Sequence, residues 1–297
     1  MRMLAVVALC TGLAACGSAP SPAPTNESPA TPVAAAPSTP TLIEIPRAPT
    51  QPRADRERAA GTAKVDFDAI ASRGFIRILV SSSRTHFETT AEGHRGTAVD
   101  IGVALAKELT ARTGSTVVPV FIATPEHDLI PRVLDGTGDV AANLLITFER
   151  DDQVAFAPAI KTGIRELVAT PSAKPMVSLE DVGGREIHVR PDTDHLASLQ
   201  RLNGQLKGIN RPQAKIVIDR THKTDEDLLD AVNAGRIPST LIDDYIFDRW
   251  KAQLPSTMVN RDIAVSQDGA LSWVSRKDAP RLVVFLKDFF STHRVAF

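Results

Sequence analysis

The side chains that most often do chemistry are few in this sequence and widely spaced. Its two cysteines, Cys10 and Cys16, both lie at the N-terminus, so the rest of the chain has no disulfide, no thiolate metal site and no cysteine nucleophile. The sequence also lacks the phosphate-binding loop, the serine-hydrolase elbow and the zinc-protease motif. Histidines and carboxylates are the remaining candidates for chemistry.

The seven histidines show no spacing typical of metal ligands, so we expect no metal site and no cofactor. They are His86, His94, His127, His188, His195, His222 and His293. His195 stands at the start of a predicted helix, where it is either solvated or a polar lining of a binding site. The acidic pairs Asp151-Asp152 and Asp243-Asp244 are better interpreted as surface charges or a ligand acceptor than as a glycosidase pair.

The charges of the chain are balanced, with 34 Lys and Arg against 35 Asp and Glu. A binder of nucleic acid needs a net basic face, so this balance argues against a nucleic-acid partner. The length of 297 residues favours two domains.

The N-terminus has the pattern of an export signal. Arg2 precedes an apolar run that is too short to span a membrane, and small residues follow it. The end of the segment resembles a bacterial lipobox, which implies cleavage before Cys16 and lipidation of Cys16; a plain signal peptide is the alternative. We therefore expect a signal peptide over 1–15 and a lipid-anchored periplasmic protein, with the outer membrane weakly favoured by Gly17.

Residues 16–61 are expected to form a disordered linker. Ten of the 21 prolines fall between Pro20 and Pro52, among Ala, Ser and Thr. Such a composition cannot bury enough apolar surface to fold, and its prolines favour an extended chain.

From about Val65 the chain alternates predicted strands and helices. Apolar runs predict strands over 75–82, 115–122, 139–146, 186–190, 215–219, 239–243 and 271–275. Helical periodicity and caps predict helices over 98–113, 124–136, 194–206, 224–235 and 245–253, and from Pro280 onward. This alternation predicts an α/β protein with mostly parallel sheets and flanking helices.

Four sequence blocks, in the same order, resemble family 3 of the periplasmic solute-binding proteins. They are residues 96–101, 141–158, 178–189 and 241–244. The resemblance implies a two-lobed periplasmic-binding-protein-like fold of type II with two crossover hinge strands. Lobe 1 is then expected over 62–168 plus 263–297, and lobe 2 over 169–262.

Within that family the sequence is most similar to the binding-protein half of membrane-bound lytic murein transglycosylase F. The similarity lies in 189–190, 198–203, 225–233 and in Asp243-Asp244 before Trp250. In those enzymes a lysozyme-like domain follows, whereas this chain ends at Phe297 and its body has no counterpart of the catalytic Glu-Ser pair. We therefore expect no enzyme activity, although a truncated relative of the longer enzymes stays open.

The resemblance implies which residues bind a ligand. Arg150 is expected to hold a ligand carboxylate through two hydrogen bonds, with Thr147 donating a third. Asp244 is expected to accept from a ligand ammonium, because adjacent strand residues face opposite ways and Asp243 then points elsewhere. Alternatively, Arg150 pairs with neighbouring acids, and Asp243 and Asp244 cap the following helix.

A turn and an aromatic residue complete the expected site. Thr193 and Arg190 belong to the turn that binds anions in the family, although Thr193 also fits a helix N-cap. Phe87 is expected to be an aromatic platform or a core residue. Leu145 and Ala155 replace polar residues of the family, which leaves open a larger, a less polar or a different ligand.

Two functions follow from these observations. The first is a monomeric solute-binding protein that captures an amino acid, or a small ligand containing one, for an ABC permease. The second is a sensor or regulator that binds muropeptides and acts on a cell-wall enzyme.

Overall fold

The computed structural model describes residues 41–42, 58, 60–174 and 176–294. The predicted signal peptide, Cys16 and most of the predicted linker lie outside these residues. Within the linker, β1 (Thr41–Leu42) pairs in parallel with β13 (His293–Arg294), where we had expected no regular structure. In the described ranges, no helix is long and apolar enough to cross a membrane.

The helices and strands alternate, as the sequence predicts. The elements up to the first long strand are α2 (Phe67–Arg73), β2 (Phe75–Val80), β3 (Glu88–Thr90), β4 (Gly93–Arg95), α3 (Thr97–Thr113), β5 (Val118–Ala123), η1 (Glu126–Asp128), α4 (Leu129–Leu134), β6 (Val140–Leu145), α5 (Phe148–Asp151), β7 (Ala155–Phe156) and β8 (Lys161–Pro171). They are followed by η2 (Leu179–Val182), β9 (Glu186–Val189), α6 (Asp194–Gly208), β10 (Lys215–Ile218), α7 (Asp225–Asn233), β11 (Thr240–Asp243), α8 (Asp244–Trp250), η3 (Lys251–Gln253), β12 (Thr257–Ser275) and α9 (Pro280–Thr292).

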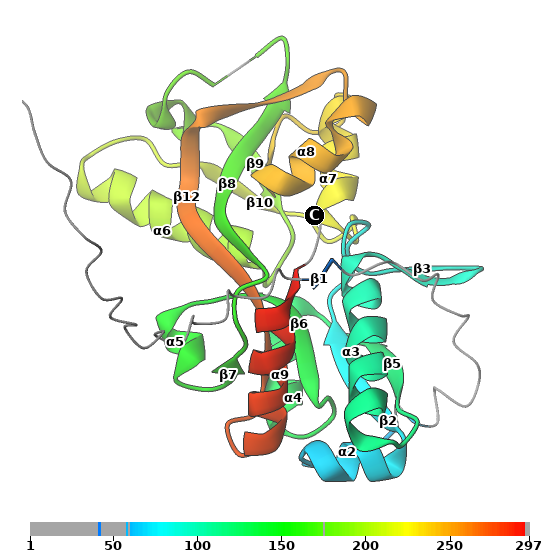
Figure 1. Ribbon diagram of the computed structural model, residues 1–297. Helices are drawn as coiled ribbons and strands as arrows, with labels where there is room; N and C mark the ends of the chain where they lie inside the picture. Colours follow the sequence, from blue (N-terminus) through cyan, green and yellow to red (C-terminus); the bar gives the residue numbers. More distant parts are fainter. Residues whose placement is uncertain (1–40, 43–57, 59, 175, 295–297) are drawn as a thin grey trace, which may run out of the picture. The chain divides into compact units, whose positions relative to one another are not determined.

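Two long strands, β8 and β12, connect two groups of elements into one sheet (Figure 1). The strand order is β10-β9-β11-β8-β12-β6-β2-β5, with β7 beside β12. β2 runs parallel to β5 and β6, and β9 runs parallel to β10 and β11. β8 and β12 run antiparallel to each other. The predicted α/β fold, with two lobes and two crossover strands, is confirmed.

Among the long strands, the two crossover strands are those that the sequence pattern located least well. β12 is 19 residues long, and only its last five were predicted as a strand. β8 begins with Lys161, Thr162 and Gly163, which interrupt any apolar run. The expected lobe boundaries, between residues 168 and 169 and between 262 and 263, fall inside these two strands and stay a prediction.

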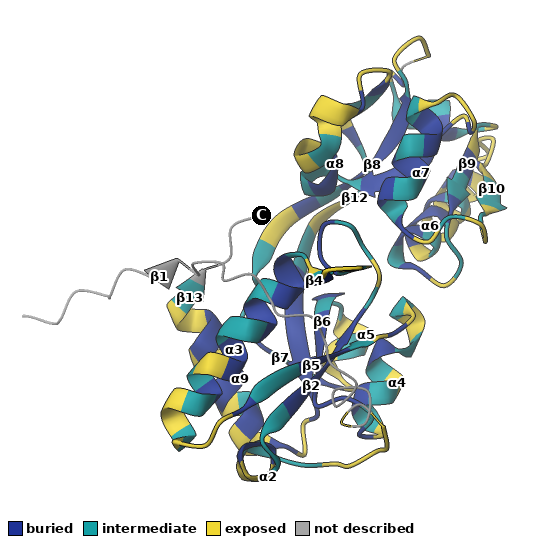
Figure 2. Ribbon diagram, turned by 90° about the vertical axis from the view of Figure 1, so that its right-hand side faces the viewer, coloured by how far each residue is buried: buried dark blue, intermediate teal, exposed yellow. Residues whose placement is uncertain are grey.

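Each group of elements has its own apolar core (Figure 2). The first half, which we define as α2 to β7 together with α9, packs around fully buried Trp273 and Phe289. The second half, β9 to α8, packs around Ile187, Leu199 and Leu241. Burial on both faces explains why β2 is apolar except for Arg77, which is itself buried.

Gly96 fixes the loop that precedes α3. Its φ is +120°, and a Cβ at this position would lie 2.3 Å from the carbonyl oxygen of His86. The backbone of residue 86 in turn accepts a hydrogen bond from Ala98 at the start of the helix. Only glycine allows this close approach of two backbone segments.

We expect Gly96→Ala to lower the free energy of unfolding by about 2–4 kcal/mol, because backbone strain and a steric clash add. Gly163→Ala is the matched control, since Gly163 also has a positive φ but nothing lies within 4 Å of its added Cβ. It should cost only about 1 kcal/mol. Urea unfolding of both variants measures the difference, and equal losses would contradict the role given to close packing at Gly96.

Candidate functional site

A cavity of about 70 Å³ lies between the two halves and is lined by both. The first half and the end of β12 contribute Ser81, Ser82, Ser83, His86, Glu126, Asn143, Leu145 and Leu271. The second half and β8 contribute Glu166, Arg190, Thr193, Asp194, His195, Asp225, Asp243, Tyr245 and Ile246. Five of these residues carry a carboxyl group, so the cavity is strongly polar and predominantly acidic.

Two of the predicted ligand residues, Arg190 and Thr193, line the cavity. Thr193 caps α6 by accepting a hydrogen bond from the backbone N–H of Leu196 at 3.4 Å. Its hydroxyl donates to the carbonyl oxygen of Arg190 at 3.1 Å. Thr193 is thus both the helix cap and a cavity residue.

Of the two adjacent acids, Asp243 lines the cavity, whereas the expected Asp244 does not. Asp244 begins α8 and turns away to Arg165, whose Nε lies 3.3 Å from its carboxylate. Asp243 ends β11, and its Oδ1 lies 3.4 Å from Nε2 of His195. The alternation of side chains along a strand had predicted that only one of the two acids faces inward.

Arg150 forms the bidentate contact expected of it, but with a carboxylate of the chain itself. Its two terminal nitrogens lie 3.0 and 2.7 Å from the carboxylate oxygens of Asp194, the first residue of α6 in the other half. The first of these nitrogens also donates to the carbonyl oxygen of Leu145. The pair therefore bridges the two halves beside the cavity.

Thr147 and Phe87 do not line the cavity. Thr147 caps α5, accepting a hydrogen bond from the backbone N–H of Arg150 at 3.3 Å. Phe87 is 2% exposed and belongs to the core of the first half, where its ring packs against His94 and Phe121. The core alternative for Phe87 thus describes its position.

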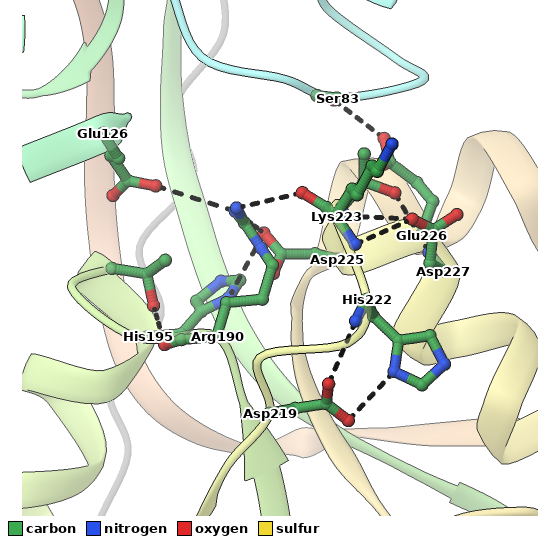
Figure 3. A network of polar contacts seen from close by, with 12 residues as sticks. Ser83, Glu126, Arg190, His195, Asp219, His222, Lys223, Asp225, Glu226 and Asp227 are labelled. Atoms are coloured by element: carbon green, nitrogen blue, oxygen red, sulfur yellow. Dashed lines mark hydrogen bonds and ion pairs between the residues drawn. The ribbon is translucent and has the colours of Figure 1, made fainter. Parts of the chain in front are cut away.

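A chain of charged groups runs along the second half of the cavity (Figure 3). Arg190 holds Asp225 through two hydrogen bonds of 2.8 and 3.0 Å. Asp225 lies 3.7 Å from Nδ1 of His195, whose other nitrogen faces Asp243. The imidazole of His195 therefore lies between two carboxylates.

These neighbours determine which groups are charged. Burial opposes the charged form of His195, but Asp225, Asp243 and Glu166 outweigh it and raise the pKa of His195 to about 10. Burial likewise opposes the charge of Arg190, yet Asp225 raises the pKa of that guanidinium. Both groups are therefore cations at neutral pH.

Glu166 of β8 is the most deeply buried acid of the cavity. It is 3% exposed, and its Oε2 has no hydrogen-bond partner in the structure. Burial raises the pKa of Glu166 above its ordinary value.

Several contacts join the two halves around the cavity. Glu126 accepts a hydrogen bond at 3.0 Å from the backbone N–H of Asp194, at the start of α6. Glu226 of α7 is fully buried and accepts from the hydroxyl of Ser83 at 2.8 Å and the backbone N–H of Thr85 at 2.9 Å. The structure is therefore a closed form in which groups of the chain itself bridge the halves.

His86 and Tyr245 form a further contact between the halves. Nε2 of His86 lies 2.7 Å from the hydroxyl of Tyr245, and Nδ1 lies 2.7 Å from that of Thr97. Burial, together with the charge of Arg249, lowers the pKa of His86 to about 3. His86 is therefore neutral, with one nitrogen donating and the other accepting.

The sequence profile of the bacterial extracellular solute-binding proteins, family 3, matches residues 76–237, more than half of the chain. The chain belongs to this family. Solute binding is the role that the family and the fold support together.

The curated proteins that are similar to this chain include enzymes. The sequence is 23% identical over 218 residues to membrane-bound lytic murein transglycosylase F of Saccharophagus degradans, covering 71% of this chain and 40% of that protein. The same-named protein of Maricaulis maris is 26% identical, with 70% and 44% covered. The chain thus spans less than half the length of these relatives.

Solved structures with the same fold include a solute receptor. A receptor for L-cysteine from Neisseria gonorrhoeae superposes with a TM-score of 0.63 at 21% identity, covering 76% of this chain and 87% of the receptor. A mutant of ArgBP from T. maritima gives 0.60 at 19% identity, covering 76% and 91%. These similarities confirm the type II fold of the family.

Sequence reasoning missed most of the acids that line the cavity. Glu166 did have a signal in the sequence. It is followed by the apolar run Leu167-Val168-Ala169, which predicts that its carboxylate is buried, and a buried carboxylate is a candidate functional group. Ser81–Ser83 directly follow β2, at the carboxyl end of a parallel strand where ligands bind in α/β sheets. Asp225 had no such signal, since it lies in an acidic stretch that also fits a helix cap.

Glu126 gives a testable pH dependence. Burial, and the charges of Asp194 and Asp225, raise its pKa from 4.5 to about 7. The folded chain thus holds this proton more tightly than the unfolded chain does. The stability it contributes is complete below about pH 4.5 and is lost as the pH rises through about 7.

We expect the free energy of unfolding to fall by on the order of 2 kcal/mol more in the native chain than in Glu126→Gln between pH 5 and 8. The glutamine carbonyl can still accept from Asp194. Urea unfolding at both pH values measures this difference, with Glu92→Gln as the exposed control. The same loss in the native chain and Glu126→Gln would contradict the assignment.

Proposed function

We propose that the protein is a non-enzymatic, extracytoplasmic solute-binding protein that captures an amino acid, or a small ligand containing one, between its halves. The observation that carries this proposal is the polar cavity, to which both halves contribute polar side chains. Membership of the solute-binding family supports it. The halves must separate to admit a solute, because the closed cavity is smaller than the several hundred Å³ typical of small-molecule sites.

Arg150 is proposed as the group that binds the carboxylate of the solute. In the closed form its guanidinium holds the carboxylate of Asp194 in the bidentate geometry that a ligand carboxylate would adopt. Asp194 therefore occupies the position of the solute carboxylate, and solute binding displaces it. Thr193 and Arg190 line the cavity beside this position.

Asp243 is proposed as the acceptor for the solute ammonium, because it is the acid of the Asp243-Asp244 pair that lines the cavity. Asp244 instead holds Arg165, whose guanidinium also donates to the carbonyl oxygen of Arg261. Thr147 is proposed to act indirectly, by capping the short helix that carries Arg150.

The proposal also includes a membrane anchor, a linker and a transport partner. We propose that a lipid on Cys16 anchors a monomer to a membrane, with the outer membrane weakly favoured, and that the linker holds the binding body in the periplasm. An ABC permease is the proposed partner that takes over the captured solute.

Competition by Asp194 predicts opposite effects of two substitutions. Arg150→Ala should weaken solute binding by about 10- to 100-fold, because two charged hydrogen bonds are lost. Asp194→Asn should strengthen binding several-fold, because the competing carboxylate is gone. A thermal-shift screen of the chain against the twenty amino acids and small peptides finds the solute, and calorimetric titration then measures both affinities. Unchanged affinity in Arg150→Ala would exclude this arginine from the site.

The two adjacent acids form a matched pair for a second test. Asp243→Asn should weaken binding of the same solute by about tenfold or more. Asp244→Asn, which removes the same charge one residue away, should leave affinity nearly unchanged. Calorimetric titration of both folded variants decides between them, and a larger loss in Asp244→Asn would restore the original expectation for that residue.

A second candidate function is supported by the curated relatives, which are named lytic murein transglycosylases. In this alternative the cavity binds muropeptides, and the protein regulates a cell-wall enzyme. Retention of the chain on purified peptidoglycan, with a thermal shift for muropeptides and none for amino acids, would favour it. Co-purification with a permease would argue against it.

A further inference from the structure

Three cavity residues bring metal-ligating atoms together. Glu166 of β8, His195 of α6 and Asp243 of β11 each offer one such atom, and these atoms all lie within 4.8 Å of one another. All three residues line the cavity. Imidazole nitrogens and carboxylate oxygens are the donors found in three-residue zinc sites and in sites for related divalent ions.

Glu166 provides an independent sign that this cluster binds a ligand. The residue is 3% exposed, and although the Ser198 side chain hydrogen-bonds to its carboxyl group, its Oε2 is buried without a hydrogen-bond partner. An unpaired buried carboxylate oxygen is costly, because it has lost its hydration without gaining a replacement. A cation between Glu166 and Asp243 would supply the missing partner.

The surroundings of His195 resemble those of a metal-bound histidine, with a carboxylate at ion-pair distance behind the ring. Its Nε2 faces Asp243 at 3.4 Å, whereas its Nδ1 lies 3.7 Å from the carboxylate of Asp225. Asp225 is itself held by the two hydrogen bonds from Arg190. A carboxylate behind the histidine orients the ring and increases the basicity of the nitrogen that binds the metal.

We propose that Glu166, His195 and Asp243 bind a divalent first-row transition-metal ion, with Zn²⁺ as the probe. The ion takes the place of the proton on Nε2 of His195, and that proton is released to solvent. Three protein ligands leave a fourth position open to water or to a polar group of a solute. Asp243 would then serve both the ion and the solute ammonium, but the zinc titration contains no solute, so its failure would leave amino-acid capture to be judged by its own titrations.

The proposal is tested by calorimetric titration of the full chain with ZnCl₂. The protein is first dialysed against a chelator to remove bound metal. We expect one equivalent of Zn²⁺ to bind, and His195→Gln and Glu166→Gln each to weaken binding by more than about tenfold. Mg²⁺ should not compete, because it is a poor partner for imidazole. His222→Gln, which removes an imidazole that contacts Asp219, and Asp248→Asn are controls that should bind as the native chain does.

Zinc X-ray absorption on the native chain gives a measurement that does not depend on the folding of variants. It should show a single histidine among nitrogen and oxygen ligands. Absence of stoichiometric binding would overturn the proposal. Zinc binding that survives in folded His195→Gln, or that is lost in His222→Gln, would place the ion outside the cavity. Either result would also overturn the proposal.

Discussion

The bidentate ion pair between Arg150 and Asp194 is the interaction on which the closed arrangement of the site depends. It joins the first turn of α6 in one half to α5 in the other. Glu126 reinforces the same point by accepting from the backbone of Asp194. Since both bonds converge on the start of α6, this helix carries Thr193 and His195 to the cavity whenever the halves are closed.

The cavity is arranged for binding rather than for stability. Placing carboxylates close together and out of water costs free energy, which protons, Arg190 and His195 only partly offset. The unpaired oxygen of Glu166 adds to this cost. The apolar cores on both sides, around Trp273 and around Leu199, supply the stability that allows such a site to persist.

How much the sequence could predict depended on whether a feature is local. The helix α3 and the strands β2 and β6 were found within a few residues, because apolar runs and glycine caps are local signals. The crossover strand β8 was missed, because polar residues at its start interrupt its apolar pattern.

The candidate site was predictable only in part, for the same physical reason. Arg190 and Thr193 were located through a turn that the family shares. The choice between Asp243 and Asp244 depended on the register of β11 against β8, and the pairing of Arg150 with Asp194 depended on how the halves close. Contacts between residues that are far apart in sequence leave no periodic signal, so Glu166, His195 and Asp243 could not be grouped beforehand.

The central claim is that the chain closes on itself, with Asp194 in the place of a solute carboxylate. A distance measurement between spin labels tests it most directly. The labels are placed at Lys107→Cys in α3 and Lys207→Cys in α6, both exposed, with Cys10 and Cys16 replaced by serine. We predict that the solute-free protein shows mainly the short distance of the closed form, and that Asp194→Asn shifts the distribution to longer distances. A solute-free protein that shows mainly long distances, unchanged by Asp194→Asn, would contradict the account.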